Sequence, residues 1–234
     1  MNRKPVCAVP AKTVINFKSA FEEKLLCDGL TFSAGSACVF SCSFCYVDDL
    51  MSRNPHTEEI RKKKIPFEDV VIRRENAVKV VKKKLLKGKG LPKHKSSSDE
   101  RVIYSSPLVD VAANMDLVRE TVEVCSLILE HTNWHIRLLS KSSLLYNLAL
   151  LIDEKWKHRM IYGFSTGTLD DDLGKVYEKG TARVSKRLKS LHKLQDEGYR
   201  TYGMICPSLP QEDYDKFARE MAEAIRVDRC EHVW

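Results

Sequence analysis

Apolar positions in the second half of the chain follow two alternating periods. Short runs rich in β-branched residues are each followed by a stretch in which apolar residues recur three and four positions apart, and this module repeats about every 30 residues. In one such stretch Met115, Val118 and Val122 fall on a single helical face, and Cys125 lies on the same stripe as a small buried residue. Repetition of this kind predicts strand–helix units that form a parallel sheet.

The pattern places strands and helices in alternation. The expected strands are 30–32, 101–104, 134–139, 160–164 and 201–206, and a sixth begins at 232–234. The expected helices are 76–86, 115–129, 144–156, 184–191 and 214–225. Gly198 is expected to end the fourth helix in a left-handed conformation. Segments 48–66 and 87–100 are rich in Pro, Gly, Ser or charge. The first is expected to be a loop or a short helical excursion, and the second a flexible connection.

These units predict an α/β fold. Five strand–helix units and the start of a sixth strand, joined by right-handed crossovers, favour a partial (β/α)6 TIM-like barrel over residues 30–234, with an incomplete C-terminus because the sequence ends inside a strand. Residues 1–29 are expected to be an N-terminal extension with one short helix at 17–26. An open doubly wound sheet is the alternative, because periodicity alone does not distinguish the two folds.

The composition predicts a cytoplasmic protein with no membrane partner. The 234 residues are 43% hydrophobic and 30% charged, which is sufficient for one large domain with a sizeable core. The sequence holds no secretory signal, and its most apolar stretch, 144–152, is too short to cross a bilayer. In the cytoplasm the eight cysteines are expected to be cluster ligands or reduced core thiols.

Positive charge is concentrated in one Lys-rich segment, residues 61–98. The chain has a net charge of +7, and between residues 61 and 95 Lys and Arg face only three acids, Glu68, Asp69 and Glu75. This local excess of positive charge attracts phosphate groups, so nucleic acid is a candidate partner of this segment. The alternative is a solvated lysine face, because the lysines do not alternate with aromatic residues as a single-strand stacking surface requires.

Three cysteines carry the most specific chemistry. Cys38, Cys42 and Cys45 follow the first expected strand with the spacing C-x3-C-x2-C. Thiolates at this spacing can each bind one iron of a [4Fe–4S] cluster and leave the fourth iron open to a ligand. A structural zinc site is the alternative, with Cys27 or His56 as the fourth ligand, although zinc normally uses short ligand pairs that this sequence lacks.

The cysteine spacing resembles the signature of the radical S-adenosylmethionine (radical SAM) superfamily, including an aromatic residue, Phe44, directly before the third cysteine. The resemblance implies a partial barrel with a [4Fe–4S] cluster whose open iron binds SAM. It further implies reductive cleavage of SAM to a 5′-deoxyadenosyl radical, which abstracts hydrogen from a substrate, and an electron donor such as a flavodoxin or ferredoxin.

Small polar side chains follow each expected strand. The loops at 105–110, 140–142, 165–172 and 206–210 lie where barrel folds place their chemistry, beyond the carboxyl ends of the strands. Hydroxyl groups there can hydrogen-bond a ribose, and a lysine such as Lys141 can neutralise a carboxylate. The alternative role is helix capping, which we favour for Thr168 and residues 170–172.

These loops resemble one branch of the superfamily, spore photoproduct lyase and its relatives. By this resemblance Ser105, Lys141 and Ser165 would contact SAM, and Tyr46 would lie beside the radical. The similar segments are Cys45-Tyr46, Ser105-Ser106-Pro107, Leu139-Ser140-Lys141-Ser142 and Phe164-Ser165-Thr166-Gly167-Thr168-Leu169-Asp170-Asp171.

The sequence departs from that branch in two places. Ile103 stands where the lyase carries its hydrogen-donating cysteine, two residues before Ser105, so repair by the lyase mechanism would need another donor, such as Cys206. The second strand is also not followed by Gly-Gly-Glu, so the SAM amino group needs another acceptor, such as Ser105 or a backbone carbonyl.

Three functions are therefore open. The leading hypothesis is a radical SAM enzyme of unknown substrate. The second is an enzyme that repairs or modifies nucleic acid, of the spore photoproduct lyase type, and it depends on the Lys-rich segment and the lyase-like loops. The third is a non-enzymatic iron–sulfur or zinc scaffold that binds a partner through its basic face.

Overall fold

Five parallel strands form the main sheet of the protein. The computed structural model describes residues 6–24, 26–38, 40–52, 62, 66, 70–105 and 107–226. Within them β3 (Leu30–Phe32), β6 (Val102–Ser105), β7 (His135–Ser140), β8 (Met160–Thr166) and β9 (Arg200–Ile205) pair in chain order, and β2 (Ile15–Asn16) adds an antiparallel edge to β3. This order is that of an open barrel wall, so the predicted α/β fold with a partial TIM-like barrel is confirmed.

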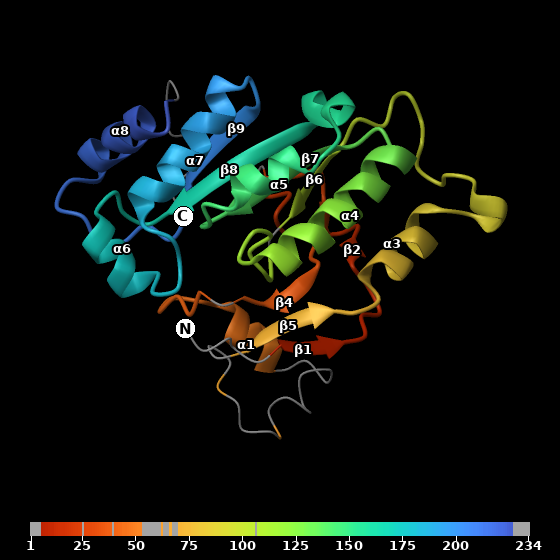
Figure 1. The fold of residues 1–234 in the computed structure, drawn as a ribbon, viewed down its shortest axis with the longest axis horizontal. Helices are drawn as coiled ribbons and strands as arrows, with labels where there is room; N and C mark the ends of the chain where they lie inside the picture. Colours follow the sequence, from red (N-terminus) through yellow and green to blue (C-terminus); the bar gives the residue numbers. More distant parts are fainter. Residues whose placement is uncertain are drawn as a thin grey trace.

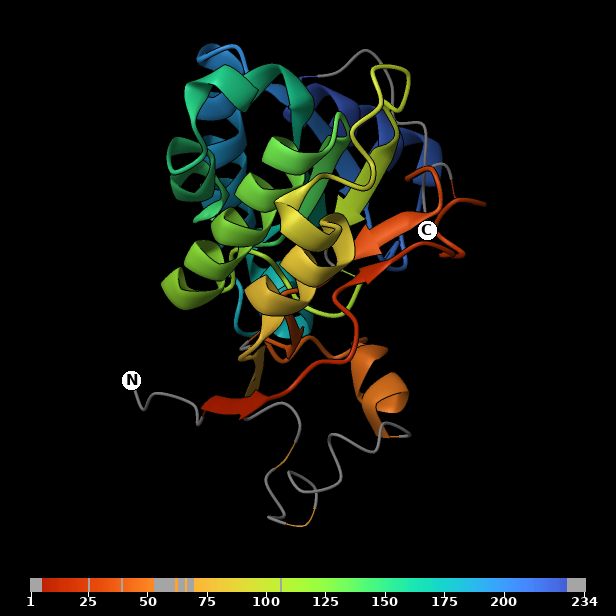
Figure 2. The same cartoon turned by 90° about the vertical axis from the view of Figure 1, so that its right-hand side faces the viewer.

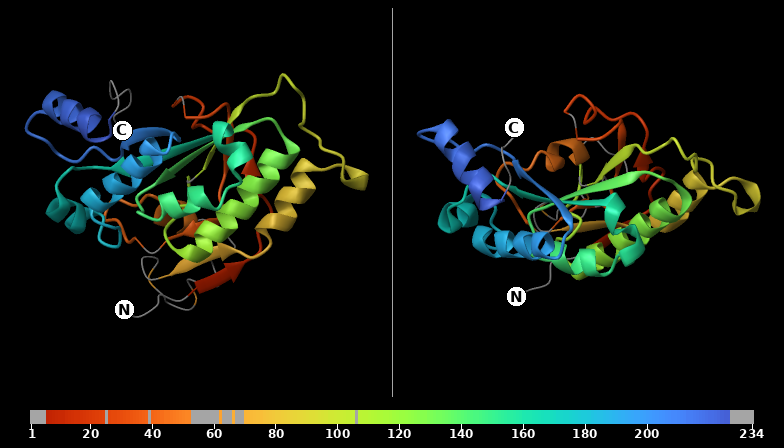
Figure 3. Two further views of the ribbon diagram at one scale, coloured as in Figure 1. Left: turned by 45° about the horizontal axis from the view of Figure 1, so that its top comes forward. Right: turned by 90° about the horizontal axis from the view of Figure 1, so that it is seen from above.

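The helices cover one face of this sheet and leave the other concave (Figure 1 and Figure 3). The predicted helices appear as α3 (Ala77–Leu85), α4 (Met115–His131), α7 (Val184–Asp196) and α8 (Tyr214–Ala224), and Gly198 follows α7 with a φ of 74°. The expected helix at 144–156 is divided into α5 (Leu145–Leu150) and a 3-10 turn, η4 (Glu154–Arg159), because Asp153 caps a new turn through the Lys155 N–H.

Successive side chains along each strand point to opposite faces of the main sheet. Ile103 belongs to the core beneath α3, α4 and α5, as does Cys125, whereas Tyr104 packs on the opposite face with Leu139 and Met204. Strand β8 is buried at all of its residues, as a strand covered on both faces requires. The concave face is therefore also covered by side chains, and the covering segment comes from the N-terminal region.

Residues 17–28 form this cover, and the helix predicted at 17–26 is wrong. The described residues of this stretch form turns that run over the concave face (Figure 2), where Phe21, Leu26 and Cys27 pack against the strands. Its internal hydrogen bonds are those of turns, such as the one from the Glu22 N–H to the Ser19 carbonyl at 3.1 Å. The end of the stretch is fixed to β6: the Asp28 N–H donates to the Val102 carbonyl at 3.0 Å, and the Val102 N–H donates to the Asp28 carboxylate at 2.6 Å.

A second, three-stranded sheet was not predicted. Its order is β1 (Val6–Val9), β5 (Val71–Arg74), β4 (Gly35–Ala37), and α1 (Val47–Ser52) follows the cysteine loop. The described part of residues 1–29 thus supplies β1 to this sheet and β2 to the main one. Strand β4 leads directly into Cys38, so this small sheet fixes the start of the cysteine loop.

The loops between helices and strands agree in part with the loops that the sequence predicts. Segment 87–100 holds a short 3-10 turn, η3 (Gly88–Gly90), and two isolated bridges. Asp170 caps α6 (Asp171–Tyr177) by accepting from the Asp172 and Leu173 N–H groups, as expected. The expected strand at 232–234 and most of 53–69 lie outside the described residues. No helix in the described part of the chain is long and apolar enough to span a membrane.

Candidate cluster and cofactor site

The three motif cysteines lie in one loop at the carboxyl edge of the main sheet. A left-handed Ser41, with a φ of 49°, turns the chain, and the Cys45 N–H donates to the Cys42 carbonyl at 3.1 Å. Burial raises the pKa of Cys38 to about 11 and that of Cys42 to about 12, and the negative charges of neighbouring groups, the other motif cysteines among them, add to this effect. The three thiols are therefore close enough to interact electrostatically, and bound metal would have to displace their protons.

The donor set fits a cluster. Thiolates are the ligands of iron–sulfur clusters, and a cube spreads three of them over three iron atoms. Among the described residues no three His, Cys, Asp or Glu side chains converge on a single-ion site. Phe40, within the loop, is buried, and the centre of the Phe44 ring lies 5.5 Å from the Lys141 ammonium. The loop thus combines sulfur ligands, apolar cover and a nearby cation.

The turn that follows α6 holds this loop in place. The Tyr177 carbonyl accepts from the Ser43 N–H at 2.9 Å and from its hydroxyl at 3.3 Å. The Gly180 N–H donates to the Phe40 carbonyl at 2.7 Å. The cysteine loop is therefore bonded to a segment about 135 residues later in the chain.

Lys141 and Ser165, two of the predicted cofactor contacts, are brought together. The Lys141 ammonium, which follows β7, donates to the Ser165 hydroxyl at 3.1 Å, the Glu178 carboxylate at 2.7 Å and the Cys206 carbonyl at 2.6 Å. An ammonium has three donors, so this arrangement uses all of them. Its charge also lowers the pKa of Cys42, against the larger effect of burial.

Glu178 and Arg187 are buried members of this site that the sequence did not reveal. The Glu178 side chain is fully buried, and Arg187, 1% exposed, contacts its second carboxylate oxygen at 2.5 Å. Arg187 also donates to the Ser165 carbonyl at 2.9 Å. No periodicity or motif singles out Glu178, because its partners are distant in sequence.

Asp110, in the loop after β6, is a half-buried carboxylate at the same edge of the sheet. It accepts from the Lys141 N–H at 2.6 Å, the Ser140 hydroxyl at 2.7 Å and the Ala112 N–H at 2.9 Å. Burial raises its pKa, and these hydrogen bonds oppose that shift. Asp110 therefore joins the loop after β6 to the end of β7, and its charge also contributes to the raised pKa of Cys38.

Ser105 and Tyr46, the other two predicted residues, lie at the loop after β6. Ser105 ends that strand fully buried, and its hydroxyl has no hydrogen-bond partner among the described residues. The Tyr46 hydroxyl donates to the Pro107 carbonyl. No hydrogen bond joins Ser105 to Lys141 or Ser165 within the described residues, and the predicted SAM contacts remain predictions.

Aromatic side chains line the concave face below this edge. Burial raises the pKa of Tyr104, and Tyr202, Tyr46 and Cys206 are near enough to add to the shift. The Arg137 guanidinium lies 5.0 Å from the Tyr202 ring. Tyr104, not Ile103, is thus the β6 residue that faces Cys206, because Ile103 points into the core beneath the helices.

The described part of the Lys-rich segment is divided between two places. Arg73 and Arg74 lie in β5 of the small sheet, which pairs with β4 before the cysteine loop, whereas the lysines from Lys79 onwards lie on α3 and the connection after it. Helix α3 and the connection that follows it lead into the start of β6, and Figure 1 shows this connection and α6 at opposite ends of the long axis. Several of its lysines have intramolecular partners: Lys93 donates to the Lys83 carbonyl, Lys95 donates to the Glu130 carbonyl, and the Lys84 ammonium lies 4.8 Å from the Phe17 ring.

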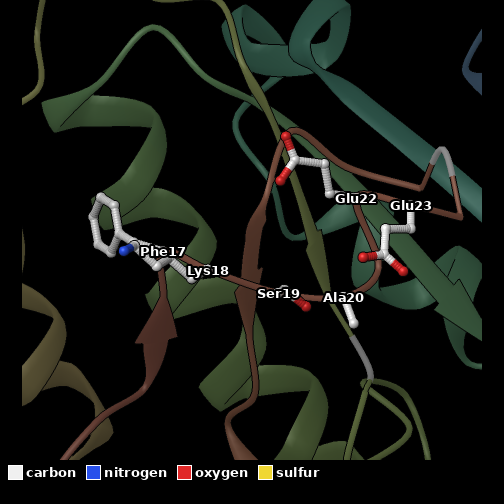
Figure 4. A pocket seen from close by; sticks show the side chains of 6 residues that line it. All are labelled: Phe17, Lys18, Ser19, Ala20, Glu22 and Glu23. Atoms are coloured by element: carbon white, nitrogen blue, oxygen red, sulfur yellow. The ribbon is translucent and has the colours of Figure 1, made fainter.

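Two surface hollows are lined by residues outside the cysteine loop 38–45. The larger, of about 610 Å³, is lined by Phe17, Lys18, Ser19, Ala20, Glu22 and Glu23, and Figure 4 shows the phenyl ring on one side and the two carboxylates on the other. The smaller, of about 220 Å³, lies between residues 9–13, Ser36, Met51 and Arg74. None of the predicted site residues lines either hollow.

Comparison with known proteins places the fold. No protein-family model and no curated protein sequence matches the chain. Among solved structures it is similar to spore photoproduct lyase complexed with dinucleoside spore photoproduct, with a TM-score of 0.66 and 13% identity over 95% of this chain and 58% of that one. A variant of that lyase with bound AdoMet and dinucleoside spore photoproduct gives a TM-score of 0.64 and 12% identity, again over 95% and 58%.

The chain therefore spans less than two thirds of the length of the lyase structures that it resembles. At 12–13% identity the similarity concerns the backbone arrangement and not the side chains. The chain has the fold of spore photoproduct lyase, as the resemblance of its cysteine motif and strand-end loops predicted.

Proposed function

We propose that the chain is a radical SAM enzyme that binds a [4Fe–4S] cluster through Cys38, Cys42 and Cys45. The observation that carries the proposal is the gathering of these three thiols in one loop at the carboxyl edge of the sheet, beside Lys141. Bound there, the cluster and SAM would supply a 5′-deoxyadenosyl radical able to abstract hydrogen from a substrate. The substrate itself is set by what the surrounding residues admit.

The residues around the loop have distinct roles in this proposal. Phe40 and Phe44 exclude water from the cluster, which influences its reduction potential. Lys141 presents a positive charge for the cofactor's carboxylate, Ser165 and Ser105 offer hydroxyls, and Tyr46 lies beside the radical. A one-electron donor of the flavodoxin or ferredoxin kind would serve as the partner.

The proposal is tested by anaerobic reconstitution with iron and sulfide, followed by dithionite and SAM. Formation of 5′-deoxyadenosine and methionine is the expected result. Cys38→Ala, Cys42→Ala and Cys45→Ala should each abolish it, whereas Cys7→Ala, a half-buried thiol outside the motif, should not. If the parent forms no 5′-deoxyadenosine, the proposal is wrong, and zinc without iron in protein purified anaerobically would favour a scaffold.

A second candidate, repair or modification of nucleic acid, is favoured by the fold shared with spore photoproduct lyase, solved with a dinucleoside photoproduct. Two observations argue against repair by the same mechanism as spore photoproduct lyase. Ile103 points away from the concave face, and the lysine-bearing connection that follows α3 lies at the opposite end of the molecule from α6 and the turn that holds the cysteine loop. Salt-dependent binding of DNA or RNA, weakened by Lys82→Glu and Lys83→Glu, would support this candidate. Binding that is weak and insensitive to salt would remove it.

A further inference from the structure

The turn after α6, residues 177–181, contacts two parts of the site at once. Its backbone bonds the cysteine loop, through the Tyr177 carbonyl and the Gly180 N–H. The side chain of Glu178, between these two residues, bonds Lys141 and Arg187. The cysteine loop and the ends of the strands are thus joined through one short segment.

Glu178 connects three strand ends. Its carboxylate holds Lys141, which follows β7, and Lys141 in turn donates to Ser165 at the end of β8 and to Cys206 beyond β9. Arg187 bonds both Glu178 and the Ser165 carbonyl.

Lys141 is the partly exposed member of this group. Arg187 already contacts Glu178, so that carboxylate has a buried cation without Lys141. Lys141 is 15% exposed and lies beside Cys42, and Asp110 is the other carboxylate near it. Its three N–H donors are used within the protein, so it acts on an anionic ligand group at the edge of the site through its charge, from a fixed position.

We propose that Glu178 is a positioning residue that orients the Lys141 ammonium and couples the cysteine loop to the cofactor-binding ends of β7, β8 and β9. The identity of the cofactor in this inference depends on the proposed function. The coupling itself depends only on the hydrogen bonds of Glu178, Lys141 and Arg187, so this inference and the proposed function can fail separately.

The first test uses the metal-free protein. Glu178→Gln keeps the shape of the side chain but removes its charge. Loss of a hydrogen bond to a charged group changes an equilibrium constant by roughly ten- to hundredfold. The equilibrium concerned here is the local opening of the cysteine loop, so the Ser43 and Gly180 amides should exchange hydrogen at least about tenfold faster. Amides within β7 should keep their rates, and Asp99→Asn, which removes an Arg-paired carboxylate at the far edge, should leave both amides unchanged. Unchanged exchange in Glu178→Gln would overturn the inference.

The second test uses protein reconstituted with iron and sulfide. Glu178→Gln should bind as much iron as the parent but bind SAM at least about tenfold more weakly, because Lys141 loses its orientation. Equal SAM affinity in the two proteins would contradict the inference. If the parent itself binds no SAM, the proposed function fails, and hydrogen exchange alone then decides the role of Glu178.

A double variant addresses the case in which Glu178→Gln does not fold. Glu178→Met with Arg187→Met removes both buried charges, and replacing a whole buried pair with apolar side chains of similar volume is often tolerated. Lys141 keeps its charge but loses its carboxylate partner. SAM affinity should stay at least about tenfold below that of the parent. Recovery to the parent value would show that Glu178 serves only to neutralise Arg187 and would overturn the inference.

Discussion

The energetic coupling between Lys141 and Glu178 is the sharpest stability prediction of the structure. At the observed separation of 2.7 Å, two unit charges attract by about 6 kcal/mol before desolvation, at an effective dielectric constant of about 20. Removing one partner of a buried pair costs about 3–5 kcal/mol net. Because Glu178 retains Arg187 and Lys141 is 15% exposed, we expect the lower end of that range, about 3 kcal/mol, for Lys141→Met.

A double-mutant cycle isolates this coupling. Lys141→Met, Glu178→Gln and the double variant are compared with the parent by urea unfolding and by thermal unfolding of the metal-free protein. Each single change should lower the midpoint of thermal unfolding by roughly 6–12 °C, and the double variant should lose at least about 1.5 kcal/mol less than the sum of the two. A control cycle on the surface pair Lys157 and Glu154 should show almost no coupling. Losses at Lys141 and Glu178 that add within about 0.5 kcal/mol would refute the reasoning.

Three further predictions concern other parts of the fold. A methyl group at Gly163 would overlap the Tyr202 ring, so Gly163→Ala should cost about 1–3 kcal/mol in urea unfolding, whereas Gly88→Ala, which has open space, should not. Asn114 caps α4 through two N–H groups, so Asn114→Ala should cost about 1 kcal/mol in the same assay. An arginine holds the pKa of Asp99 at about 2, below its unfolded value, so its stabilisation is present above about pH 4 and lost towards pH 2. Asp99→Asn should flatten the fall in unfolding free energy over that interval, and an unchanged slope would contradict the assignment.

Helices and strands whose pattern of apolar residues is clear over their whole length could be predicted from the sequence. The residues of β8 carry no charge and are buried throughout, and α4 alternates apolar positions over its whole length. The small sheet could not be predicted in the same way. Strand β4 reads Gly-Ser-Ala, which has no β-branched residue, and its pairing with β5 is a tertiary contact that local preference does not encode.

The error at 17–26 has a similar cause. Phe17, Phe21 and Leu26 have nearly helical spacing, but they serve different neighbours. Phe17 packs near His94 and Trp134, whereas Phe21 and Leu26 face the concave side of the sheet. Contacts with the sheet thus determine the conformation, as tertiary context often does for short segments.

The residues of the candidate site also divide into those that the local sequence identifies and those that depend on tertiary contacts. The three cysteines could be identified because a cluster needs thiolates close together in sequence, and Lys141 because a lone cation followed a strand. Glu178, Arg187 and Asp110 could not, since each acts on a partner from another element. Their roles become visible only when the strand ends are brought to one edge.

The most direct test of the central claim is iron and sulfide analysis with electron paramagnetic resonance on the anaerobically reconstituted, dithionite-reduced protein. The account predicts about four irons and four sulfides per chain, with a signal that changes when SAM is added. A variant with Ala at all three motif positions, 38, 42 and 45, should hold neither. A parent protein without iron, or with a signal that SAM leaves unchanged, would contradict the account.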